Sequence, residues 1–134
     1  MWPKALSTVT GLMLTLAGLP VYGHHAFAVE FDVELPVSLT GTVTKVEMIN
    51  PHSWIHIEVT DNSGDKTVWM IEGGSPNALY RQGITRNSVP VGAELTVNGY
   101  QARDQSNRAV GRDITFSDGR ALFFSGTQVP EETE

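Results

Sequence analysis

Apolar and polar residues alternate along much of the chain, with the period expected of β-strands that bury one face. The clearest case is residues 53–60, in which Ile55, Ile57 and Val59 alternate with polar or aromatic positions. Three aliphatic side chains in one phase indicate a face turned toward a core. We therefore expect His56, which belongs to the other phase, to lie on the outer face of this strand.

Five further segments carry the β-branched and aromatic residues that favour strands. They cover residues 39–48, 67–72, 94–100, 111–116 and 121–125. In the first of them the apolar phase shifts near residues 44–45, which predicts a β-bulge and a strongly bent strand. Asn50 and Pro51 then predict a turn, because proline has no N–H to donate to a sheet.

One short helix is predicted between the third and fourth strands. Ser75 can cap free backbone N–H groups, Pro76 fits the first helical turn, and Gly83 suits the exit. This order of elements is that of the OB-type barrel, whereas an immunoglobulin-like sandwich has about seven strands and no helix at this place. We therefore expect an all-β fold with one short helix, an OB-like barrel of about five or six strands.

The first residues have the pattern of a secretory signal peptide. Lys4 supplies a positive charge, and residues 5–20 form an apolar run that is short and weakly flanked for a spanning helix. Cleavage after Gly23 would make His24 the new N-terminus, whereas cleavage one residue earlier would leave Gly23 at the start. An uncleaved anchor is the alternative, and the lack of stop-transfer charges disfavours it.

The expected organisation is a signal peptide at residues 1–23, a single barrel domain at residues 24–127 and an acidic tail at residues 128–134. Such a protein would be periplasmic or secreted, with no stable membrane insertion after cleavage. Residues 24–36 are expected to form an extended arm that packs Phe27, Val29 and Phe31 onto the domain.

Composition narrows the possible functions. The chain has 134 residues, a formal net charge of -6 and no cysteine. Disulfides, thiolate metal sites and thiol nucleophiles are therefore excluded, and the negative charge argues against a nucleic-acid partner. The carboxylates are scattered, and neighbours such as His52 and Ser53 point to opposite faces of a strand, so we do not expect an enzyme.

Several short motifs are distinctive when they are taken together. They are His24-His25-Ala26-Phe27-Ala28, Phe31-Asp32, Gly41-Thr42-Val43, Asn50-Pro51-His52-Ser53-Trp54, Trp69-Met70-Ile71-Glu72 and residues 114–120. In this combination the chain resembles an uncharacterised family of small exported bacterial proteins. That family commonly has serine where Ala26 stands, so no role is given to a hydroxyl there. The resemblance implies export and a small β-barrel-like domain, and it implies no mechanism.

The four histidines carry the most specific chemistry. A free His24 would offer its α-amine and its imidazole to one ion, and His25, His52 or His56 would complete a site like a copper histidine brace. Copper is the metal that we expect, with zinc as the alternative. Taken singly, each histidine also has a structural interpretation, such as His56 pairing with Glu58.

Spacing limits this metal hypothesis. His52 and His56 lie about 13 Å apart if their strand is fully extended, so a bend or the N-terminal arm would have to unite them. Met48 or Met70 would add a thioether, which favours Cu(I). If the mature chain started at Gly23, its third residue would be a histidine. The amine, two amide nitrogens and the imidazole could then surround square-planar Cu(II) or Ni(II).

A metal-independent binding module is the alternative function. Trp54, Trp69 and Tyr100 could give the barrel an aromatic face on which a glycan or a peptide stacks. The structural interpretation instead places Trp69 in the core, in phase with Ile71, and Trp54 over the outer face of its strand.

Overall fold

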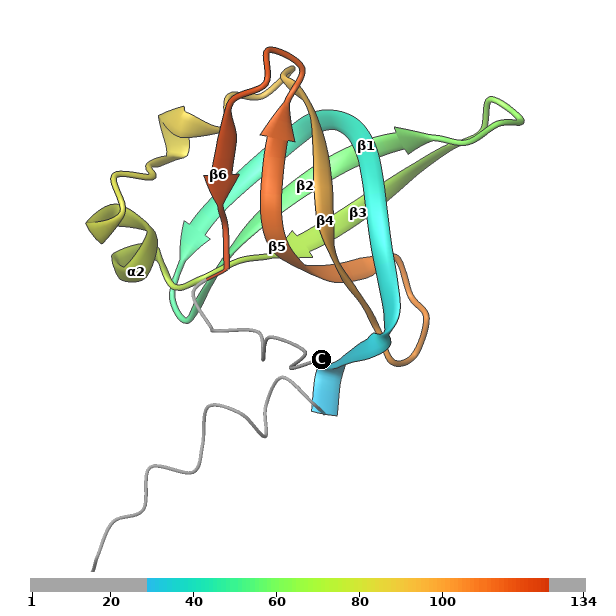
Figure 1. Cartoon of the computed structure of the whole chain (residues 1–134), viewed down its shortest axis with the longest axis horizontal. Coiled ribbons are helices and arrows are strands. Elements are labelled where there is room, and N and C mark those ends of the chain that lie inside the picture. The colour runs from blue at the N-terminus through green and yellow to red at the C-terminus, as the bar shows by residue number, and fades with distance from the viewer. Residues whose placement is uncertain (1–28, 126–134) are drawn as a thin grey trace, which may run out of the picture.

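The computed structural model describes residues 29–125 (Figure 1). The expected signal peptide and acidic tail lie outside the described residues. The same is true of Phe27 and of two candidate ligands, His24 and His25.

Six strands, one short α-helix and one 3-10 turn follow one another in the described part of the chain. In order they are β1 (Phe31–Ile49), β2 (His52–Thr60), β3 (Lys66–Glu72), α2 (Pro76–Arg81), η1 (Arg86–Ser88), β4 (Glu94–Ala102), β5 (Arg108–Phe116) and β6 (Ala121–Phe123).

Strands β1 to β5 form a barrel-like ring, and β6 is added at the free edge of β5 (Figure 1). Neighbours pair in the order β3-β2-β1-β4-β5-β6, and a further pairing of β3 with β5 closes the ring. This closing pair is parallel, whereas the others are antiparallel. The predicted fold class, all-β with one short helix and an OB-like order of elements, is confirmed.

Strand β1 is long and sharply bent, so that its first half pairs with β4 and its second half with β2 (Figure 1). The predicted bulge is present, because the register with β2 shifts between Val43 and Lys45. The strand begins earlier than predicted, at Phe31, since residues 36–38 also pair with β4. Likewise β5 begins at Arg108, because its first residues pair with β3.

The core lies inside the ring and is closed at one end by the helix. Ile57 and Ile71 of neighbouring strands are fully buried there, and so is Leu79 of α2. The predicted helix start is confirmed, since the Ser75 hydroxyl accepts a hydrogen bond from the Ala78 N–H at 3.2 Å. Between residues 29 and 125, none of the helices has the length and apolar character needed to cross a bilayer.

A second, smaller cluster lies on the outer side of the ring. Phe31 is buried there against Ala102 and Val110, with Tyr100 beside them. The expected packing of Phe31 onto the domain is therefore confirmed. The expectation for Val29 is wrong, because this residue belongs to a helical turn before β1 and is 76% exposed.

The buried strand face predicts a clear difference in stability between two substitutions. Ile57→Ala should lower the free energy of unfolding by about 2–5 kcal/mol, because it leaves a cavity in a packed core. Val68→Ala, at a half-exposed position of β3, should change it by less than about 1 kcal/mol. Urea denaturation followed by circular dichroism measures both. Equal losses would contradict the assignment of the core face.

Candidate functional site

Strand β2 presents two histidines on its outer face. Ser53, Ile55 and Ile57 are fully buried. His52 and His56 occupy the alternate phase and therefore point away from the core. The predicted position of His56 on the outer face is confirmed.

His52 is held by a buried carboxylate. Its Nδ1 atom contacts Oε1 of Glu72, whose side chain is only 7% exposed. The other oxygen of Glu72, Oε2, has no hydrogen-bond partner among the described residues. Burial raises the pKa of the Glu72 carboxyl, and the neighbouring His52 only partly offsets this rise. The His52 side chain itself is 46% exposed, so solvent reaches part of this side chain.

The first described residues lie beside this pair. Glu30 forms an ion pair with Arg108, and its carbonyl accepts a hydrogen bond from the Arg103 N–H at 3.0 Å. The charge of Glu30 further raises the pKa of Glu72, while that of Arg108 lowers it. Arg108, the ion-pair partner of Glu30, lies opposite Met70 in the β3–β5 pairing, two residues before Glu72, so Glu30 lies near the strand that carries the partner of His52.

A surface hollow of about 390 Å³ opens next to His52. It combines an imidazole, a thioether, a carboxylate and an indole ring. The lining residues are Glu47, Ile49, Asn50, Pro51, His52, Trp54 and Met70. The hollow can therefore present nitrogen, sulfur and oxygen atoms to one small ligand.

His56 has a different carboxylate partner from the one expected. Its Nε2 atom lies 2.8 Å from Oε2 of Glu47, and Lys45 pairs with the same carboxylate at 2.8 Å. These two hydrogen bonds, from Lys45 first and from His56 second, lower the pKa of Glu47. Glu58, the partner predicted from the sequence, pairs instead with Lys66. The reason is that Glu47 reaches His56 from the neighbouring strand, diagonally across the ladder.

The structure does not bring His52 and His56 together. Both belong to β2, which pairs without a shift from Trp54 to Thr60 against β3, so the backbone positions of the two histidines lie about 13 Å apart along the strand. In residues 29–125, no three His, Cys, Asp or Glu side chains are grouped closely enough to hold a metal ion. Any site built on His52 therefore needs ligands of another kind or from outside this range.

The two methionines considered as soft ligands lie on different faces. Met48 pairs with the buried Ser53 and packs against the core. Met70 pairs with His56 and lines the hollow. The thioether available to the outer histidines is thus that of Met70.

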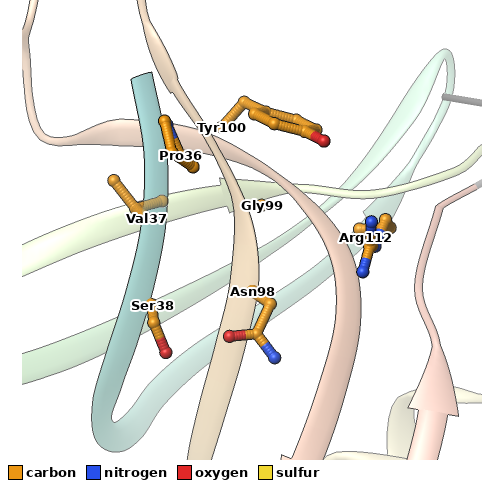
Figure 2. Close-up of a pocket in the computed structure, with 7 residues that line it drawn as sticks. All are labelled: Pro36, Val37, Ser38, Asn98, Gly99, Tyr100 and Arg112. Carbon is orange, nitrogen blue, oxygen red and sulfur yellow. The ribbon is translucent and has the colours of Figure 1, made fainter. Parts of the chain in front are cut away.

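The three aromatic candidates do not form one surface. Trp54 lines the hollow beside His52, whereas Trp69 packs against the core. Tyr100 packs with the outer cluster of Phe31 and lines a second hollow of about 380 Å³. Figure 2 shows this second hollow, in which Tyr100 and Asn98 of β4 lie beside residues 36–38 of β1, with Arg112 on the far side.

Sequence reasoning did not identify Glu72 and Glu47 as partners of the histidines. Glu72 ends β3 in the same phase as Met70, which places it on the outer face, where a carboxylate is ordinarily solvated. It is buried because the segment around Glu30 and Arg108 lies beside it. These residues are far from Glu72 in the sequence, so the pattern around Glu72 does not predict their contact. Glu47 is five positions from His52 and nine from His56, and only the strand register shows which of the two it meets.

Comparison with known proteins gives a family and no activity. A model of a family of unknown function (DUF6152) matches residues 13–111. The match includes β1 to β4, and with them both outer histidines and the hollow. The curated proteins contain no match to this chain.

The buried Glu72 predicts a pH-dependent difference in stability. A raised pKa means that the folded protein keeps this proton to a higher pH than the unfolded chain does. The resulting stabilisation is present at low pH and is lost as pH rises through the folded pKa. We therefore expect the unfolding free energy of the parent protein to fall, relative to Glu72→Gln, as pH is raised from about 4 to about 8.

Urea denaturation at several pH values measures this difference. Glu34→Gln, at an exposed carboxylate, is the control for removing one negative charge. A parent protein that gains stability over Glu72→Gln with rising pH would contradict the burial of Glu72.

Proposed function

Since the chain belongs to a family of unknown function (DUF6152), we propose a function from its site: this is a small exported protein that binds a transition-metal ion. Copper is the preferred metal and zinc the alternative. The proposed ligands are the α-amine and imidazole of His24 together with the imidazole of His52. The proposed role is binding and not catalysis.

The observation that carries this proposal is the contact between His52 and the buried Glu72. A carboxylate that accepts the Nδ1 proton fixes the tautomer of the ring and leaves the lone pair of Nε2 free. Histidines that bind metals in proteins are usually oriented in this way by a carboxylate or a carbonyl. With 46% of the His52 side chain exposed, an ion has access to the ring.

The position of Glu30 supports the participation of His24. Glu30 forms an ion pair with Arg108 of β5, and its charge acts on Glu72, the partner of His52. Glu30 is six positions after His24, and six residue steps span at most about 20 Å when extended. On this chain length the proposal assigns the amine and imidazole of His24 to the same ion as His52.

The proposed ligand set suits copper. An amine and two imidazoles supply three nitrogen donors, and copper accepts such sets in planar arrangements with an open position. If processing leaves Gly23 at the start, His25 becomes the third residue and the same arm binds Cu(II) through its backbone nitrogens. Both versions depend on a free amine.

An aromatic binding face has less support. Such a face needs neighbouring rings, and Trp54, Trp69 and Tyr100 lie on separate surfaces. Trp54 alone remains beside the proposed metal site. Its fluorescence should therefore report binding of Cu(II), and a response to a glycan or a peptide instead of the metal would favour the alternative function.

The ligand assignment predicts which changes weaken Cu(II) binding. For this test, the full-length chain is expressed in cells and the mature protein is purified. Mass spectrometry then identifies its N-terminus. Adding one residue before that terminus, or replacing His52 by alanine, should each weaken Cu(II) binding about tenfold or more, because each removes a ligand. Competition titration against a chromophoric chelator measures the affinity.

His56→Ala is the matched control. It removes an imidazole from the same face of the same strand, and the affinity for Cu(II) should stay within a factor of about two. Unchanged binding by the N-terminally extended form would rule out the proposal, and so would unchanged binding by His52→Ala.

A further inference from the structure

A second set of metal-binding side chains lies further along the same face of β2. Met70 of β3 stands directly opposite His56. Side chains in such a pair have Cβ atoms about 4.5–5.5 Å apart. Trp54 precedes His56 by two residues and shares its face, and it lines the hollow together with Met70. An imidazole, a thioether and an indole ring thus lie on one face of two neighbouring strands.

The hydrogen bonding of His56 leaves one ring nitrogen for a ligand. Its Nε2 atom lies 2.8 Å from the Glu47 carboxylate, and Lys45 holds the same carboxylate from the other side. A carboxylate accepts a proton and does not donate one, so the ring carries its proton on Nε2. In the neutral ring the lone pair is then on Nδ1, and Glu47 orients the ring as carboxylates orient metal-binding histidines elsewhere.

We propose that Nδ1 of His56, Sδ of Met70 and the indole face of Trp54 form a site for a soft monovalent ion, Cu(I) or Ag(I). Thioethers select Cu(I) over harder ions. An indole ring attracts a cation placed over its face, and the attraction grows when the site is partly desolvated. The His56 side chain is only 15% exposed, which provides such an environment.

This site has a different nitrogen ligand from the one under the proposed function, although Trp54 and Met70 also line the hollow beside His52. It uses neither the amine of His24 nor His52, which is about 13 Å away along the strand. Only one of its three groups, the imidazole of His56, is of the His, Cys, Asp or Glu type. The other two are the thioether of Met70 and the indole ring of Trp54, so the site does not need three such residues close together. The protein would therefore hold oxidised and reduced copper at different places on one face.

The test compares two Met→Leu substitutions on neighbouring strands. Met70→Leu removes the proposed ligand, whereas Met48→Leu removes a thioether that packs against the core. Both changes conserve volume, so both variants should fold, which circular dichroism verifies. Ag(I) is titrated into the exported protein in competition with a thioether chelator, because silver binds like Cu(I) without changing oxidation state.

Met70→Leu should weaken Ag(I) binding about tenfold or more, while Met48→Leu leaves it unchanged. Ag(I) should also change the fluorescence of the parent protein, and Trp54→Phe should remove most of that change. Equal Ag(I) affinities in the two methionine variants would overturn the proposal.

Blocking the N-terminal amine separates the two sites. It should weaken Cu(II) binding about tenfold or more and leave Ag(I) binding intact. Loss of Ag(I) binding in the amine-blocked protein would overturn the soft-metal site. An unaffected Cu(II) affinity in the same protein would instead rule out the proposed function and leave this site standing.

Discussion

The parallel pairing of β3 with β5 is the contact on which the rest of this structure depends. It places Glu72 opposite Val110 and closes the ring of strands. On the outer side of the same junction, Val110 packs with Phe31, so the start of β1 is held over it. Glu72 is buried because ring closure and the start of β1 meet at this point.

Burial of a carboxylate has chemical consequences for its neighbours. Desolvation penalises the charged form of Glu72, and a hydrogen bond from His52 is the contact that best offsets that cost. The imidazole is thereby fixed on one edge and exposed on the other. His56 is fixed in the same manner by Glu47, on the other side of Trp54. Two oriented imidazoles on one straight strand favour two separate sites over one shared site.

Much of the fold could be predicted from local pattern. The alternation around Ile57, the bulge near Val43 and the capping by Ser75 each reflect interactions among residues close in sequence, and all three are present. The first residues of β1 and β5 were harder to predict. Pairing with β4 extends β1, and pairing with β3 extends β5, beyond the apolar run that marks each strand in the sequence. The alternation of residues along the strand was enough to predict that His56 lies on the outer face. It was not enough to predict that Glu47 is the partner of His56.

The sequence by itself determined the secondary structure, the buried face of β2 and the types of atom available to a metal. These depend on backbone sterics and on side-chain period, which act over a few residues. Only the tertiary structure decided that Met70 and not Met48 accompanies the histidines, that Glu72 is buried, and that the three aromatic residues lie apart. Those outcomes depend on strand register and ring closure, which join residues far apart in the chain and leave no periodic signal.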